Sequence, residues 1–485
     1  MPPSASAAAA RGQAGIPGEA EVGVEGGLVG SGPARTAPDD ADAARGGGAA
    51  GSVAAGPPVE YALADSTQAT SDESPAADFA KPSDGAGTSQ RAKAAAWTAA
   101  RVVFAVAVGF GMGAVFGMGL DRSGVAAPAV VRLQLVFRKE VMIKYWLAAL
   151  ATVGVCFIVL RVLARDAFEQ ARCARPWGEK GAVTVTVGAL LQGAGYALTG
   201  SCPGTVYAQM GAGVPWAWAV FVGGLVGALV HGLVDPWLAP LAKRDFQMTY
   251  AKVFTSGFLD EQKAAPLAGR VRFEAAAGLI VVCSAAVLIA LEVVFPWQAE
   301  TSGIYGVRTG ATGLMPPSLA GGVIGLLQIP CCLVFGTLIG TSAGYSTVAS
   351  QWIRLVPPSR RSRARAFFKT ASSFSTSPSA WQLVYGLGAV LGGYLSSSGV
   401  VVPPPSPGTP NGVGPGFAFV GGFVMILGAR VSGGCASGHG LSGVTALAVN
   451  GWLALPMMFA GAIPTAFIMQ AAMGEEAFSL APQVP

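Results

Sequence analysis

Two cysteines, Cys202 and Cys435, stand in matching sequence patterns and are the residues best suited to do chemistry. Residues 195–205 read GYALTGSCPGT and residues 428–438 read GARVSGGCASG. In both, glycine, three residues, threonine or serine, glycine and one further residue precede the cysteine. A thiol is weakly polar and polarizable, which suits a ligand that carries its own sulfur better than phosphate or a carboxylate. The repeated pattern therefore predicts a site for a soft anion that uses both thiols.

Small residues after each cysteine support the same interpretation. Gly204 and Gly438 would let the backbone come close to a ligand, and Thr205 and Ser437 could cap a short helix or donate hydrogen bonds to the ligand. A helix that starts just after the cysteine would also point free backbone N–H groups at an anion. Because a thiolate would repel an anion, we expect protonated thiols that donate S–H to the ligand.

Arg430 and His439 flank the second cysteine. Arg430 lies inside an apolar run, where a charge is usually functional or paired, although its side chain could instead extend to the membrane interface. In either case it would favour anions at the inner mouth. His439 follows Cys435 by four residues and could tune the thiol, or could simply pack or bond to the backbone. With only two histidines in the chain, His231 and His439, no metal site is expected.

The remaining cysteines give weaker signals. Cys331 and Cys332 are adjacent in QIPCCLVFG and could contribute to the site, but adjacent cysteines in an apolar helix are more often packing residues. We expect Cys156 and Cys283 to lie in the core, and we assign no role to Cys173, which lies beside arginines. The odd number and the apolar surroundings argue against a disulfide framework.

The composition indicates a membrane protein. Hydrophobic residues make up 52% of the chain, charged residues 12%, and the mean hydropathy is +0.52, whereas soluble domains carry about 25% charged residues. The net charge of +5 resides largely in loops between apolar runs, as membrane topology requires, so no nucleic-acid partner is expected. No phosphate-binding Gly-Lys-Ser/Thr loop occurs, which disfavours ATP-driven pumping, and no cofactor is expected.

The chain divides into a polar tail and a membrane part. Residues 1–95 are rich in Ala, Gly, Pro and Ser and are predicted to be disordered. We expect a first transmembrane repeat over 96–260, a second over 261–475 and a short tail over 476–485. The apolar runs predict an all-α polytopic protein with about nine spans. These lie near 102–120, 142–163, 181–200, 214–234, 273–296, 317–340, 380–397, 415–433 and 451–472.

Basic residues predict the orientation of these spans. Arginines and lysines follow the second, fourth and sixth spans, which places those loops in the cytoplasm. One loop, with Arg122, Arg132, Arg138 and Lys139, disagrees with this orientation.

Segments 201–213 and 434–448 are too short to span and are predicted to be re-entrant, entering from opposite faces. Such an inverted repeat places a ligand site near the bilayer midplane.

Residues 429–443 (ARVSGGCASGHGLSG) resemble the Gly-Cys-x-Ser-Gly-His-Gly signature of the YeeE/YedE sulfur-transport membrane proteins. Residues 198–205 (LTGSCPGT) are similar to the Gly-x-Cys-Pro-Gly-Thr motif of the same family. The resemblance covers roughly residues 100–475. It implies re-entrant helices from both faces and passage of thiosulfate between the thiols of Cys202 and Cys435. A departure is that 117–128 (GMGLDRSGVAAP) lacks the cysteine that importers of this kind can carry there, so that Cys331 or Cys332 is a candidate replacement.

Three functions are compatible with these patterns. The first is a transporter or channel for thiosulfate or a related small sulfur-containing anion. The second is a membrane-embedded sulfurtransferase or thiol redox enzyme, which would need a base beside the thiol, and only His439 qualifies. The third is transport of another small solute. The expected partners are the anion and the lipid bilayer, of a plasma membrane or an organelle, with a soluble sulfur-handling protein as a further candidate.

Overall fold

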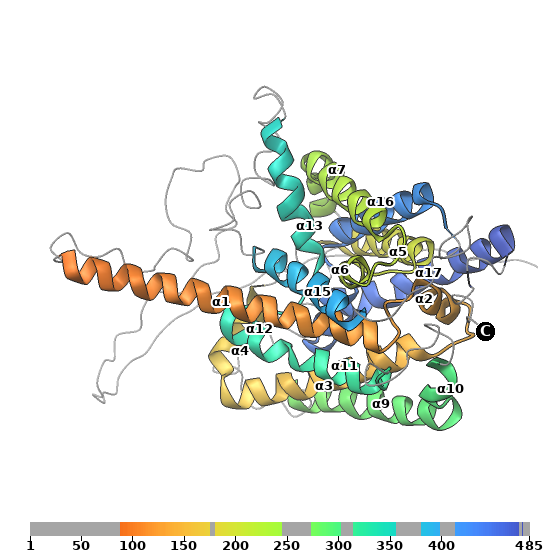
Figure 1. The fold of residues 1–485 in the computed structure, drawn as a ribbon, viewed down its shortest axis with the longest axis horizontal. Coiled ribbons are helices and arrows are strands. Elements are labelled where there is room, and N and C mark those ends of the chain that lie inside the picture. Colours follow the sequence, from red (N-terminus) through yellow and green to blue (C-terminus); the bar gives the residue numbers. More distant parts are fainter. Residues whose placement is uncertain are drawn as a thin grey trace, which may run out of the picture. The chain divides into compact units, whose positions relative to one another are not determined.

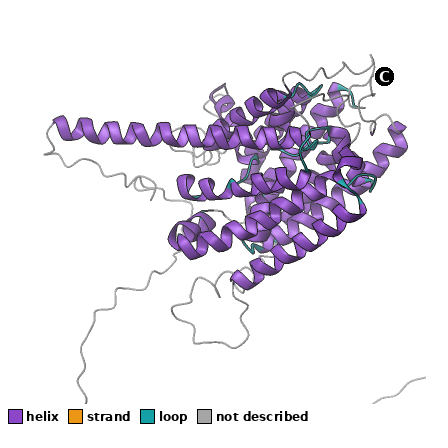
Figure 2. Ribbon diagram, turned by 60° about the horizontal axis from the view of Figure 1, so that its bottom comes forward, coloured by secondary structure: helices purple, strands orange, loops and turns teal. Residues whose placement is uncertain are grey.

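The computed structural model describes residues 88–174, 180–244, 273–301, 314–355, 380–397, 413–474 and 478. Its regular elements within these ranges are helices joined by short loops (Figure 2). The predicted disordered tail lies outside the described residues, except that helix α1 (Thr88–Arg122) begins inside the expected range. The predicted C-terminal tail and the proposed boundary near residue 260 also lie outside, apart from Phe478.

Within the described residues, eight stretches are long and apolar enough to cross a membrane, which confirms an all-α, multi-pass membrane protein. They are the Ala100–Arg122 part of α1, α3 (Val141–Leu163), α5 (Ala182–Thr199), the Ala217–Asp235 part of α7 (Ala217–Arg244), α9 (Phe273–Val294), Pro317–Phe335, α16 (Pro415–Ser432) and α17 (Val449–Met473). Eight of the about nine predicted spans are thus confirmed within these residues. The other predicted span is α15 (Trp381–Ser397), whose 17 residues make it shorter than each of the eight.

Short helices fill the segments between the long ones. Helix α6 (Thr205–Gly211) and the π-helical η4 (Ala436–Gly443) occupy the two segments predicted to be re-entrant. Two more short helices are α2 (Pro128–Leu135), between α1 and α3, and α13 (Ser342–Ala349), which lies between α12 and α15 in the sequence. The sixth predicted span is divided at Leu327 into α11 (Pro317–Leu326) and α12 (Gln328–Phe335). The remaining short elements are α4 (Arg165–Cys173), α10 (Trp297–Thr301) and η2 (Ser350–Leu355).

Helices from the first half of the sequence pack against helices from the second half (Figure 1). Helix α1 packs on α15, and correspondingly α3 packs on α11. Helix α7 packs on α16, and α17 packs on α5. Helices α5 and α16 pack on each other, as they would if they were equivalent elements beside a two-fold axis. This exchange of packing partners is what a two-fold repeat predicts.

Glycines allow α5 and α16 to approach closely. A β-carbon at Gly188 would lie only 2.4 Å from the backbone nitrogen of Ser432, and one at Gly195 would lie 2.5 Å from the Cα of Met425. Small residues at a helix crossing are what permits such contact within a membrane. Because α5 ends at Thr199 and α16 ends at Ser432, this crossing fixes the start of both cysteine loops.

Two of the basic residues that disagreed with the predicted orientation have structural roles. Arg132 is fully buried on α2, and its Nε and Nη2 donate hydrogen bonds to the carbonyls of Ala197 (3.1 Å) and Leu198 (3.0 Å) at the end of α5. Lys139 donates to the Glu300 carbonyl. An arginine that bonds the last carbonyls of a helix stabilises that end. These side chains hold the fold together and do not count as loop charges.

Candidate functional site

Cys202 lies in the turn between α5 and α6. Helix α5 stops at Gly200, whose φ of +62° places it in the left-handed region that glycine adopts readily. The Cys202 sulfur lies 2.9 Å from the Thr205 hydroxyl and accepts a hydrogen bond from the Thr205 N–H at 3.4 Å. The thiol is therefore held by the first residue of α6.

Cys435 lies between α16 and η4 and is more deeply buried, with 1% of its surface exposed. Its sulfur lies 3.3 Å from the Ser437 hydroxyl and 3.5 Å from the Thr341 hydroxyl. It also accepts a hydrogen bond of 3.5 Å from the Thr341 N–H. This thiol is thus held by η4 and by the start of α13, which lies about a hundred residues earlier in the chain.

The two cysteine loops meet at Thr341, and Phe116 packs against the first of them. A β-carbon at Gly204 would lie 3.3 Å from the Thr341 methyl group and 2.9 Å from the Phe116 ring. A side chain at residue 204 would therefore push the Cys202 loop away from Thr341, which bonds the Cys435 sulfur. Glycine at this position permits the close approach.

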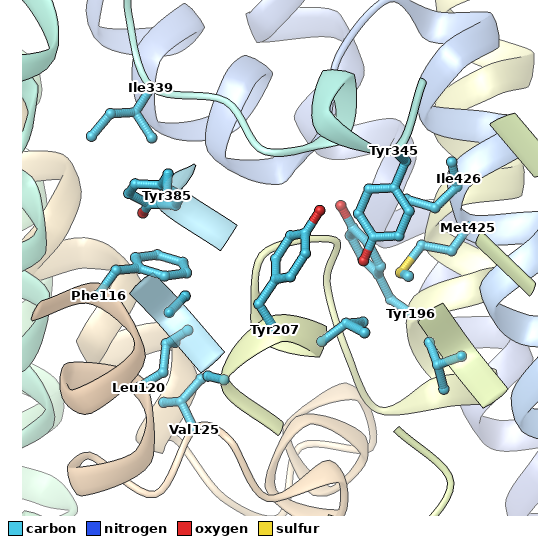
Figure 3. Close-up of a cluster of buried hydrophobic side chains, with 14 of the residues drawn as sticks. Phe116, Leu120, Val125, Tyr196, Tyr207, Ile339, Tyr345, Tyr385, Met425 and Ile426 are labelled. Carbon is cyan, nitrogen blue, oxygen red and sulfur yellow. The ribbon is translucent and has the colours of Figure 1, made fainter. Parts of the chain in front are cut away.

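Two tyrosines bond the backbone beside the thiols. The Tyr345 hydroxyl donates to the carbonyl of Pro203 at 3.1 Å, next to Cys202. The Ala436 N–H, next to Cys435, donates to the hydroxyl of Tyr196 at 3.1 Å. Figure 3 shows these two rings with Tyr207 in one buried cluster, and Tyr385 beside Phe116 across from them. The surroundings of the thiols are thus aromatic, with hydroxyl groups as their polar component.

A family comparison decides what kind of protein this is. The family model described as sulphur transport matches residues 122–464, which is more than half of the chain and includes both cysteine loops. The chain belongs to the sulphur transport family. No protein in the curated set matches it. The family match confirms the resemblance to the YeeE/YedE proteins and makes this chain a multi-pass membrane protein of sulfur transport.

The hydroxyl groups of Thr205 and Ser437 do not cap helices, which was one of their two predicted roles. Thr205 and Ser437 were candidates to cap the helices after the cysteines, but neither α6 nor η4 has a side-chain cap. Both hydroxyls contact a thiol instead. The reason is geometric, because each sulfur lies on the same side of the turn as the hydroxyl two or three residues later. The backbone of Gly438, also expected at the site, interacts with the Cys435 sulfur.

Arg430 lies in the last turn of α16 and is half-buried. It is close enough to His231 on α7 for their charges to interact, and Lys180 acts on His231 in the same way. Lys180 is paired with Asp235 at 3.6 Å, and its Cγ would lie 3.3 Å from a β-carbon at Gly433. Arg430 thus belongs to a predominantly basic group near the end of α16.

His439 is buried, and its ring lies against the backbone of Gly434, where a β-carbon would lie 2.7 Å from the ring. Its backbone N–H donates to the Cys435 carbonyl at 2.7 Å. The His439 ring thus packs on the backbone of the loop that carries Cys435.

The remaining cysteines differ in their burial and contacts. Cys156 is buried in α3, with its sulfur 3.8 Å from the Gly325 carbonyl, as expected for a core residue. The same expectation for Cys283 is wrong, because this residue is exposed on α9. Cys331 and Cys332 are buried in α12, and Cys332 donates to the Ala167 carbonyl at 3.5 Å. Cys173 is exposed at the end of α4.

Sequence reasoning missed Thr341, Tyr196 and Tyr345. A signal for the first was present, since residues 340–346 (GTSAGYS) form a run of small and hydroxyl residues after an apolar stretch, much like the run after Cys202. The tyrosines carried no such signal, because their contacts join segments far apart in the sequence.

Proposed function

We propose that this protein transports thiosulfate or a related small sulfur-containing anion, and that the anion passes between the thiols of Cys202 and Cys435. The observation that carries this proposal is the meeting of the two cysteine loops at Thr341 inside the helix bundle. The family match supports sulfur transport, and the choice of thiosulfate rests on the chemistry of the two thiols.

The polar groups around each sulfur suit transient binding. The hydroxyls of Thr205, Ser437 and Thr341 each contact a thiol, and each can rotate to donate to an oxyanion instead. A thiol can in turn donate S–H to the terminal sulfur of thiosulfate. These hydrogen bonds are individually modest, which allows the anion to leave as well as to bind.

The enzyme alternative has less support from the geometry. A nucleophilic thiol in a sulfurtransferase or redox enzyme is activated by a neighbouring base. The hydrogen bonds that the structure shows to the two sulfurs come from hydroxyl and backbone N–H groups. The imidazole of His439 packs on Gly434. Transport therefore accounts for these contacts better than catalysis does.

An exchange assay tests the proposal without knowledge of the driving ion. Liposomes containing the purified protein are preloaded with unlabelled thiosulfate and placed in radiolabelled thiosulfate. We expect label to accumulate with saturation kinetics, and excess phosphate to compete far less well than excess thiosulfate. Accumulation no faster than in protein-free liposomes would contradict the proposal. The assay contains no soluble protein, so it also shows whether a sulfur-handling partner is needed.

A further inference from the structure

Helix α15 carries two buried hydrogen-bond donors one helical turn apart, Trp381 and Tyr385. Tyr385 is 1% exposed, and its hydroxyl has no hydrogen-bond partner within the described part of the chain. The indole nitrogen of Trp381 is likewise buried and unpartnered there, although the Trp381 ring itself is partly exposed. Residues four positions apart share a helix face, so the two donors lie along one side of α15.

Aromatic rings surround these donors in a continuous row. Phe335 stacks on Trp381, with ring centroids 4.9 Å apart and an interplanar angle of 19°. Trp381 meets Tyr385 edge-on at 5.8 Å, and Tyr385 meets Phe116 at 5.3 Å. The Phe116 ring is the group nearest to Gly204 in the Cys202 loop. The row therefore leads from a partly exposed pair of rings to the meeting point of the cysteine loops.

The position of Tyr385 links it to the thiols. It is close enough to Cys202 and Cys435 for a charge on either sulfur to act on it. Buried polar groups are nearly always hydrogen-bonded, so two unpartnered donors along one aromatic row point to a ligand that supplies acceptors. An indole N–H can only donate, which excludes a donor-only ligand and favours an oxyanion.

We propose that Tyr385 and Trp381 form a second subsite that binds the oxygen atoms of the transported anion. This inference rests on the proposed function. It adds that different residues recognise the oxygen atoms and the terminal sulfur of the anion. The phenol and the indole would bind the sulfonate oxygens, whereas the thiols of Cys202 and Cys435 would recognise the terminal sulfur. Sulfate shares the oxygens and lacks that sulfur, so it should bind at the aromatic subsite and gain nothing from the thiols.

Single variants in the exchange assay test the subsite. Tyr385→Phe removes one oxygen and Trp381→Phe removes the indole N–H. Each should raise the KM for thiosulfate by about tenfold, and should raise the inhibition constant of sulfate by a similar factor. Tyr394→Phe on the same helix and Trp218→Phe on α7 are matched controls, because these rings are 60% and 56% exposed. Both controls should keep the wild-type KM.

The outcomes separate this inference from the proposed function. If the wild-type protein exchanges no thiosulfate, the proposed function fails. If the wild-type protein is active but both variants keep its KM and its sulfate inhibition constant, the inference is overturned. It is also overturned if the variants lower kcat and leave both of these constants unchanged. Gel filtration of the purified variants shows whether they fold. Should one variant fail to fold, the other decides the question, because the two donors belong to the same subsite.

Discussion

The two thiols differ in how their sulfur atoms are held. The Cys202 sulfur is held by residues that follow it closely in sequence, through the hydroxyl and the N–H group of Thr205 and the backbone of Gly204. Cys435 contacts Ser437 and also Thr341, which belongs to a distant segment. The orientation of the Cys435 thiol therefore depends on α13 staying in place. Substitution of Thr341 therefore tests whether transport requires this contact between α13 and the Cys435 thiol.

Thr341→Val keeps the shape of the side chain and removes the hydroxyl beside Cys435. Loss of one such hydrogen bond costs about 1 kcal/mol, so we expect the rate of thiosulfate exchange to fall roughly fivefold. Thr341→Ser should keep most of the activity because the hydroxyl survives. Thr347→Val is the matched control, since the hydroxyl of this buried α13 threonine donates to the Ala343 carbonyl within its own helix. Wild-type exchange by Thr341→Val would show that the hydroxyl has no role.

Arg430 offers a second test at the level of single residues. Its guanidinium is always charged and can bond two oxygens of one anion. If it concentrates anions near the end of α16, Arg430→Gln should slow exchange of a divalent anion several-fold, and Arg430→Lys should retain part of the rate because the charge survives. If Arg430 only anchors α16 at the interface, both variants should exchange thiosulfate normally. Exchange rates normalised to the amount of reconstituted protein distinguish the two roles.

At the scale of elements, the crossing of α5 and α16 determines where both cysteine loops begin. Gly188→Ala places a methyl group 2.4 Å from the backbone nitrogen of Ser432, so the helices must separate. We expect the protein to lose about 1–3 kcal/mol of stability, as for other overpacked positions, and thermal unfolding in detergent should shift to lower temperature. Gly111→Ala is the control, since nothing lies within 4 Å of its β-carbon. Equal melting temperatures for the two variants would contradict the close crossing.

The long apolar runs predicted most of the helices, because a helix that crosses lipid needs a continuous apolar stretch. Burial could not be predicted in the same way. Cys156 and Cys283 both lie in apolar runs, yet the first is buried and the second is exposed on α9. Lipid is as apolar as the protein interior, so a helix facing lipid and a helix in the core have similar sequences. The expectation for Cys283 failed for this reason.

The candidate site was predictable where its contacts are local. Cys202 with Thr205, and Cys435 with Ser437, were singled out by a repeated motif, and the structure joins the members of each pair. Thr341 was missed because its contact with Cys435 depends on the packing of α13 against the rest of the bundle. Short motifs report local geometry, whereas contacts between distant segments follow from the tertiary fold.

At the scale of the whole molecule, the two cysteine loops have corresponding packing partners, as the predicted repeat requires. Helix α6 packs on α15 and α7, and η4 packs on α3 and α17, so each cysteine loop is followed by a short helix that contacts the corresponding pair. Such an arrangement is typical of transporters whose ligand site lies between two repeats. Under this account, neither thiol alone is sufficient for passage of the anion.

Replacement of each thiol tests that claim most directly. The measurement is the rate of radiolabelled thiosulfate exchange by liposomes containing Cys202→Ala or Cys435→Ala, with Cys156→Ala and Cys283→Ala as controls from outside the site. Because small residues replace small residues, the stability cost should be about 1 kcal/mol. We expect each site variant to lose most of its exchange activity while remaining folded, and both controls to keep most of theirs. Wild-type exchange by either Cys202→Ala or Cys435→Ala would contradict passage between the two thiols.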